Sequence, residues 1–225
     1  MTILRADSSV VELPLFQGED GGAIPTSALQ LKFKVITSQT LNDVVVENHY
    51  AHRAVPCSWS FGCFNSSELL GVISFGKPAS PHLCRGICGA ENSSRVYELN
   101  RLWLDDRCPK NSESRFISWS IRELSKLRPY LILVSYADTG AGHNGAIYAA
   151  TNWTYTGLSD KRSSGDKVVG NKHSRHSRTM EDAVIVPRTR KHRFVYFCNP
   201  ADRCLLKWDI ANWKEWKEWK EYKGE

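Results

Sequence analysis

The stretch from Tyr97 to Gly157 decides the fold class, and it reads YELNRLWL (97–104), DDRCPKNSESRFISWSIREL (105–124) and SKLRPYLILVSYADTGAGHNGAIYAATNWTYTG (125–157). Its apolar and alternating runs predict the order strand, helix, strand, glycine-rich loop, helix, strand. Such an order needs neighbouring strands with helices packed on their faces. Polar residues gather where these strands end, which is where open α/β sheets bind ligands. The sequence therefore predicts an α/β (α+β) domain with a mixed central sheet flanked by helices.

Composition sets the broad class of the protein. The chain has 225 residues, of which 41% are hydrophobic and 24% are charged, as in a globular protein. No apolar run reaches the roughly 18 residues of a membrane span, and the N-terminus lacks a secretory pattern, so we expect a cytoplasmic protein with no membrane partner. The seven cysteines include no CxxC pair, which predicts free thiols. A metal cluster at His82, Cys84 and Cys88 is the alternative.

The positive charge is concentrated in one segment. Residues 161–193 contain ten Lys or Arg and three Asp or Glu, an excess of seven, so the remainder of this +6 chain sums to −1. Counterion release from phosphates makes such a segment suited to a polyanion. The run KHSRHSR (172–178) and the aromatic residues at 194, 196 and 197 favour a nucleic acid. The alternative is a solvated basic loop.

The rest of the chain supplies a frame for this unit. Residues 1–28 form a loose lead-in, a strand follows near Leu31–Val35, and a helix ends in the polar cluster at residues 49–53. Apolar runs at 59–64 and 69–75 predict a hairpin, followed by a loop of about 20 residues. A last strand begins at Arg193. The tail, residues 201–225, predicts a solvated or partner-binding helix, because aromatic residues that recur every three positions spread around a helix.

Two places in the central stretch carry candidate binding groups. In the strand at Tyr97, alternation places Leu99 and Arg101 on one face and Asn100 on the other. Polar residues in mid-strand indicate either a ligand-facing surface or an internal salt bridge. The helix that begins near Asn111 or Ser112 offers first-turn N–H groups to a phosphate, or is an ordinary capped helix.

Four motifs together identify a family resemblance. YELNRLWL (97–104), PKNSESRFI (109–117), YLILVSYAD (130–138) and HNGAIYAATNW (143–153) resemble the Mom DNA-modification proteins of phage Mu and its relatives, over roughly residues 30–200. The resemblance implies the acyl-CoA N-acyltransferase (GNAT) fold for a catalytic domain at 29–200. It also implies conversion of adenine in double-stranded phage DNA to N6-(carbamoylmethyl)adenine, which protects the DNA from restriction in the host cytoplasm.

The resemblance also implies a set of site residues. An acyl-CoA, such as acetyl-CoA, would lie between the strands 97–103 and 130–137, with its pyrophosphate at Asn111, Ser112, Ser114 and Arg115. The loop there, KNSESRF, differs from the usual glycine-rich Q/R-x-x-G-x-G/A. Iron would be held by His49, Tyr50 and Asp138, although His49 and Tyr50 also read as a packing pair at a helix end. The reacting atoms would be surrounded by catalytic groups at Asp138, Tyr148, Ser114, Arg101 and Tyr50. DNA phosphates would contact Lys172, Arg175, Arg178, Arg188, Arg190 and Lys191.

The product and substrate impose further demands. A carbamoylmethyl group cannot come from acetyl transfer alone, which suggests metal or radical help. Adenine N6 is hidden by pairing, so the base would be flipped out and stacked on Tyr148, Tyr50 or Trp103. Two alternatives remain: an ordinary N-acetyltransferase that needs no DNA, and a non-enzymatic DNA-binding protein for which Asp138→Ala changes no activity.

Overall fold

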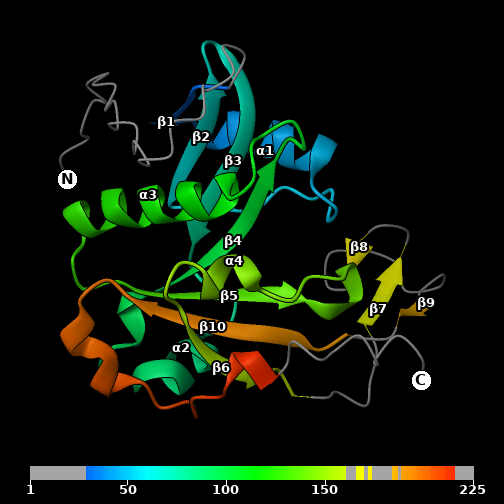
Figure 1. Ribbon diagram of the computed structural model, residues 1–225. Helices are drawn as coiled ribbons and strands as arrows, with labels where there is room; N and C mark the ends of the chain where they lie inside the picture. The colour runs from blue at the N-terminus through cyan, green and yellow to red at the C-terminus, as the bar shows by residue number, and fades with distance from the viewer. Residues whose placement is uncertain (1–28, 161–165, 170–171, 174–183, 187–188, 216–225) are drawn as a thin grey trace. The chain divides into compact units, whose positions relative to one another are not determined.

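The computed structural model describes residues 29–160, 166–169, 172–173, 184–186 and 189–215. The chain divides into two compact units, Met1–Leu133 with Phe197–Lys207 and Val134–Tyr196 with Trp208–Glu225. A seven-stranded sheet has the order β1-β2-β3-β4-β5-β10-β6 and is accompanied by helices (Figure 1). This mixed α/β architecture confirms the fold class predicted from the sequence.

The first unit is built on an antiparallel sheet. β1 (Leu31–Val35), β2 (Trp59–Asn65), β3 (Glu68–Gly76) and β4 (Val96–Leu104) pair in that order, and the expected hairpin is β2–β3. The helices of this unit are α1 (Ser38–Asn48), α2 (Pro81–Cys88) and α3 (Ser112–Leu127). Two 3₁₀ turns, η1 (Ser93–Arg95) and η4 (Pro200–Leu205), complete it.

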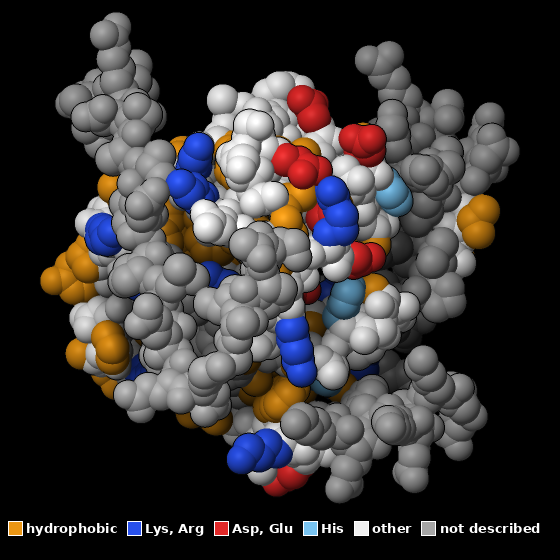
Figure 2. Space-filling model, turned by 45° about the horizontal axis from the view of Figure 1, so that its top comes forward, with side chains coloured by type: hydrophobic (Ala, Val, Ile, Leu, Met, Phe, Trp, Pro, Cys, Tyr) orange, Lys and Arg blue, Asp and Glu red, His pale blue; other side chains and the backbone are white. Residues whose placement is uncertain are grey.

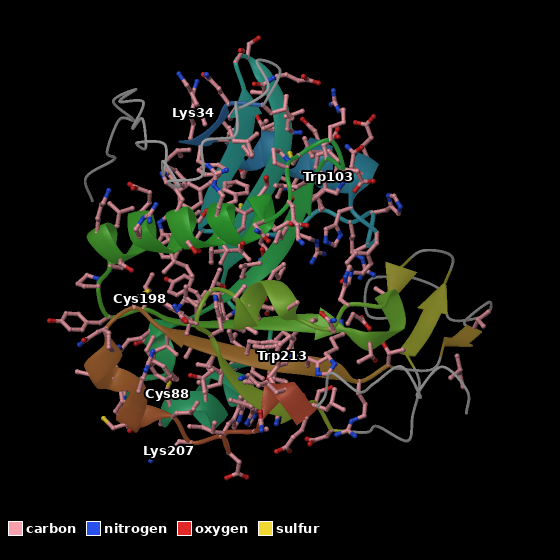
Figure 3. All side chains as sticks on the ribbon, in the orientation of Figure 1. Lys34, Cys88, Trp103, Cys198, Lys207 and Trp213 are labelled. Atoms are coloured by element: carbon pink, nitrogen blue, oxygen red, sulfur yellow. The ribbon has the colours of Figure 1, made fainter. Side chains whose placement is uncertain are left out.

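Helices α1 and α3 cover opposite faces of this sheet. Phe33 of β1 stacks on Phe116 of α3 at 4.8 Å, and Phe61 of β2 meets Trp119 of α3 edge to face at 5.4 Å. On the other face Val72 of β3 is fully buried in a cluster with Leu41 and Val45 of α1 and with Trp103 (Figure 3). The alternation of side chains along a strand is what gives one sheet two apolar faces.

The second unit holds the other half of the central stretch. β5 (Ile132–Asp138) leads through η2 (Thr139–Ala141) to the short helix α4 (Ala146–Ala149) and then to β6 (Thr154–Leu158). β10 (Lys191–Phe197) pairs antiparallel with β6. The core of this unit is aromatic, because Tyr148, Trp153, Tyr155 and Phe194 are all buried.

Part of the basic segment forms a separate small sheet. β7 (Asp166–Val169) lies between β8 (Lys172–His173) and β9 (Val184–Val186), with antiparallel pairing on both sides. Val184 and Ile185 of β9 are 65% and 64% exposed. The basic segment therefore contains strands, which differs from the alternative reading of a solvated basic loop.

Two elements differ from the sequence-based prediction. The long loop after β3 contains α2, whose N-terminus is capped by Ser80 and begins with Pro81, a residue that fits the first helical turn. In place of a helical tail from residue 201, η4 lies in the first unit, where Asp202 pairs with Arg95. The repeat from residue 216 onward lies outside the described residues.

The predicted free thiols are confirmed. All seven cysteines are free, and Cys84 and Cys88 are buried on α2. Burial raises the pKa of both thiols, to about 11 at Cys88, which keeps them protonated. Within the described ranges no helix is long and apolar enough to cross a membrane.

Candidate functional site

A β-bulge in β4 shapes the centre of the candidate site. Ser74 of β3 pairs with Arg101, whereas the next residue, Phe75, pairs with Leu99, so Asn100 is an extra residue on β4. The bulge reverses the alternation and places Leu99 and Arg101 on opposite faces, which corrects the sequence-based expectation of one shared face. Ser74 Oγ donates to Asn100 Oδ1 at 2.6 Å, which fixes the bulge.

The bulge directs Arg101 to the α1 face of the sheet, where it meets the end of α1. Its guanidinium is half-buried and donates to the carbonyl oxygens of Asn100 at 2.6 Å and Arg53 at 3.4 Å. Its Nε is buried and has no hydrogen-bond partner. Burial lowers the pKa of the Arg101 guanidinium, and the negative charges that Tyr50 and Glu98 can carry partly offset this effect.

Tyr50 is the exposed aromatic group of this site. Its side chain is 56% exposed, and its ring lies 4.3 Å from the ring of His49, centroid to centroid. The exposed residues His52 and Arg53 follow after Ala51. A half-buried cation with a spare donor beside an exposed phenol ring suits a ligand that is planar and carries an acceptor or a negative charge.

His49 does not have the arrangement of a metal ligand. It is 6% exposed, and its Nδ1 accepts a hydrogen bond from the backbone N–H of Ala51 at 3.1 Å. Because a backbone N–H always donates, Nδ1 supplies the lone pair and the proton of the neutral ring resides on Nε2. A metal-binding histidine coordinates through one nitrogen and donates from the other. In His49 the first nitrogen is occupied and the second carries the proton.

Asp138 is likewise committed to the protein. Its Oδ1 accepts from the backbone N–H of Gly140 at 3.0 Å and from the hydroxyl of Thr189 at 2.6 Å. Its Oδ2 pairs with Lys191 Nζ at 3.0 Å. Burial raises the pKa of this carboxyl, but the bonds from Thr189 and Lys191 outweigh burial and hold the pKa below its ordinary value. Asp138 therefore joins the end of β5 to the start of β10 as a carboxylate.

Together these contacts argue against the iron site that the resemblance implies. Nδ1 of His49 and both carboxylate oxygens of Asp138 already have partners within the protein. In the part of the chain that is described, no group of three or more His, Cys, Asp or Glu is arranged to hold a metal ion. These residues do not fit iron.

The start of α3 offers amide groups more than hydroxyls. Ser112 is buried and its hydroxyl donates to the Pro109 carbonyl at 2.6 Å, while the Ser114 hydroxyl donates to the Asn111 carbonyl at 2.9 Å. Asn111 has φ of 68° and makes no side-chain cap. The Ser112 amide also donates to the Pro109 carbonyl, at 3.1 Å, so what remains for an anion is the next amides of the first turn and the exposed side chain of Arg115.

Tyr148 is placed in a core. It is 6% exposed, with the rings of Phe194 and Trp153 at 5.1 and 5.3 Å. A base could stack on it only after these neighbours moved. Trp103 packs on the α1 cluster, so Tyr50 presents the most exposed ring of the three candidates for base stacking.

The candidate DNA-contacting residues have different surroundings. Lys191 pairs with Asp138, and Arg190 Nε donates to the Ser159 carbonyl at 2.7 Å. Lys172 is placed in β8 by its backbone, whereas Arg175, Arg178 and Arg188 lie outside the described residues. On the face shown in Figure 2, the described Lys and Arg side chains are scattered among acidic ones.

Three contacts of the two units were not found from the sequence. Ser74 fixes the bulge, Thr189 holds Asp138, and Trp213 Nε1 donates to the Asn144 carbonyl at 3.0 Å. No motif marks Ser74 or Thr189. Trp213 begins a visible repeat, WKEWKEWKEY (213–222), but the repeat alone does not identify its partner.

The chain is similar in sequence to a protein of known name. The methylcarbamoylase Mom of Escherichia phage Mu is 30% identical over 152 residues, which make up 67% of this chain and 63% of that protein. The chain thus aligns with less than two thirds of that relative's length.

Similar solved structures are acetyltransferases. One from Staphylococcus aureus Mu50 has a TM-score of 0.47 at 12% identity, covering 75% of this chain and 98% of that one. A putative acetyltransferase from Acinetobacter baylyi has a TM-score of 0.49 at 12% identity, covering 78% and 96%. A third, from Salmonella typhimurium and solved with acetyl-CoA, has a TM-score of 0.47 at 10% identity, covering 76% and 95%.

The family model described as the Mom protein family matches residues 30–215, which include every site residue discussed above. The chain therefore belongs to the Mom protein family.

Proposed function

We propose that this chain is a DNA-modifying transferase that converts adenine in double-stranded DNA to N6-(carbamoylmethyl)adenine. The observation that carries the proposal is the family match over residues 30–215. The 30% identity to a protein named a methylcarbamoylase supports it. The enzyme would act in the host cytoplasm and protect phage DNA from restriction.

The first unit would receive the base. An adenine that leaves the duplex loses its stacking, and an exposed aromatic ring restores part of it. Tyr50 offers such a ring at the end of α1. Arg101, whose Nε lacks a partner, would donate to an acceptor on the substrate or stabilise negative charge that develops as the group is transferred.

The basic segment would hold the duplex. Residues 161–193 carry an excess of seven positive charges, and β7, β8 and β9 give part of this segment a sheet. Each phosphate neutralised by Lys or Arg releases counterions, so affinity would fall steeply with salt. Because Asp138 already neutralises Lys191, we expect the other cations of the segment to contribute more.

We propose that an acyl-CoA binds at the start of α3. The amides at the start of α3 and the side chain of Arg115 would bind its pyrophosphate, whereas the Ser112 and Ser114 hydroxyls already donate within their own turn. The acidic residue Glu113 in this turn weakens the positive field there. No step is assigned to iron, because His49 and Asp138 do not fit it.

The test is the chemical state of adenine in cells that express the protein. DNA is digested to nucleosides and analysed by mass spectrometry, and we expect a deoxyadenosine heavier by one carbamoylmethyl group. Arg101→Gln should abolish the product. Arg122→Gln makes the same change at an exposed position on α3 and should leave it intact.

Other outcomes would separate the alternatives. Unmodified deoxyadenosine from soluble, folded protein would overturn the proposal. Acetylated protein amines formed without DNA would then indicate an ordinary N-acetyltransferase. DNA binding without any new nucleoside would indicate a non-enzymatic DNA-binding protein.

A further inference from the structure

The loop between β5 and α4, residues 138–145, has an unusual need for external support. It contains three glycines, and Gly142 and Gly145 both have positive φ, at 75° and 79°. Glycine-rich backbone loses much conformational entropy when it is fixed in one conformation. Contacts from outside the loop must therefore hold it.

One end of the loop is held by Asp138, as described above, and the other end is held from the C-terminal segment. Trp213 Nε1 donates to the carbonyl of Asn144 at 3.0 Å, and Asn144 Oδ1 in turn accepts from the Ala146 amide at 3.0 Å (Figure 3). Gly145 lies so close to Phe194 that a Cβ there would clash with the ring. The entry to α4 is thus fixed between the indole and the core.

The segment that supplies Trp213 has its own attachments in the same unit. Trp208 covers the guanidinium of Arg193 at 4.5 Å from the ring centroid. The Ala211 amide donates to the Tyr155 carbonyl at 3.0 Å, which ties the segment to β6. These two contacts fix the backbone that carries Trp213, so the indole is held next to the loop.

We propose that residues 208–215 form a C-terminal strap, and that Trp213 is a positioning residue that holds loop 138–145 for the reaction. The strap assigns a task to the first tryptophan of the WKEWKEWKEY repeat. Its effect on catalysis rests on the proposed function, whereas its effect on the loop does not.

Hydrogen exchange followed by mass spectrometry tests the strap directly in the full-length protein. The reporters are the amides of His143 and Ala146, which are bonded to the Asp138 carbonyl and to Asn144 Oδ1. Trp213→Phe keeps a ring but removes the N–H donor, and one net hydrogen bond of about 1 kcal/mol corresponds to roughly fivefold faster exchange. The matched control is Trp208→Phe, which makes the same change in the strap without touching the loop and should leave these amides unchanged.

The possible results test the strap and the proposed DNA modification separately. Unchanged exchange in Trp213→Phe, or equal acceleration in Trp208→Phe, would overturn the strap whether or not the protein modifies DNA. If exchange accelerates selectively and the wild type yields modified adenine, Trp213→Phe should lower the yield of modified adenine at unchanged Tm. Full yield from that variant would refute the positioning role. A wild type that leaves adenine unmodified would refute only the proposed function, because the exchange result would still decide the strap.

Discussion

Replacing Asp138 should destabilise the protein, because its carboxylate joins the end of β5 to the start of β10; we call this set of contacts the Asp138 clasp. The carboxylate accepts from the Gly140 amide and the Thr189 hydroxyl and pairs with Lys191, so Asp138→Ala removes all three interactions at once. Asp138→Asn keeps an acceptor oxygen for Gly140 and Thr189 and removes only the charge.

The contacts set the size of the effect. A hydrogen bond to a charged acceptor contributes about 1.5 kcal/mol at the low end, and an ordinary one about 1 kcal/mol. The side chain of Lys191 is 44% exposed and that of Asp138 is 17% exposed, so the ion pair is screened and adds only about 0.5 kcal/mol. We therefore expect Asp138→Ala to cost about 3 kcal/mol, or a Tm loss of roughly 6–12 °C for a chain of this size. Asp138→Asn should cost about 1 kcal/mol.

Thermal and urea unfolding of the purified variants measures this. Asp160→Ala, at an exposed position of the same unit, is the matched control and should be near neutral. A double-mutant cycle with Thr189→Val should give a coupling energy of about 1.5 kcal/mol. Equal Tm values for Asp138→Ala and Asp160→Ala would refute the clasp. If Asp138→Asn were as unstable as Asp138→Ala, the charge of Asp138, and not its hydrogen bonds, would account for the stabilisation.

Three other predictions concern the same unit. Burial and the charge of Arg190 lower the pKa of His192 in the folded protein. On acidification the unfolded chain therefore takes up the proton first, so the free energy of unfolding should fall as the pH drops below about 6.5. His192→Gln should reduce this pH dependence in urea titrations at stepped pH. Gly145→Ala should lower Tm far more than Gly142→Ala, since both have positive φ but only the first would meet a ring, and similar losses would contradict the packing argument. The salt dependence of DNA affinity is measured by filter binding at stepped salt concentrations. Lys191→Met should leave its slope almost unchanged, because Lys191 is paired with Asp138, whereas Lys172→Met should reduce the slope by about 0.9. Equal reductions by both substitutions would show that the Lys191–Asp138 ion pair breaks when DNA binds.

Sequence periodicity was sufficient for the fold class but not for the orientation of the site. The apolar runs located β2, β3, β4, α3 and β5 within a few residues, because burial on one or two faces leaves a regular pattern. The bulge at Asn100 leaves no such pattern, since one extra residue shifts every following side chain to the other face. The direction in which Arg101 points was therefore outside the reach of alternation.

Candidate residues were harder to interpret than elements for a related reason. A polar residue in a motif looks the same in sequence whether its partner is a ligand or the protein. Asp138 and Lys191 were assigned to different tasks, catalysis and DNA contact, yet they pair with each other across more than fifty residues of chain. Ser112 was assigned to a cofactor, yet its hydroxyl donates to Pro109 three residues away. Neither kind of partner can be read from composition or spacing.

Arg101 differs from Asp138 and Ser112, whose polar groups are bonded within the protein. Its guanidinium donates to two carbonyl oxygens, and its Nε–H is buried without a hydrogen-bond partner. A buried N–H donor without an acceptor costs stability, because it gives up its hydrogen bond to water and gains none in the protein. The polar groups of Asp138 and Ser112 are bonded within the protein and contribute to the fold, whereas the Nε–H of Arg101 still lacks an acceptor. The most economical explanation for keeping such a group beside the exposed ring of Tyr50 is that the substrate supplies what the protein does not.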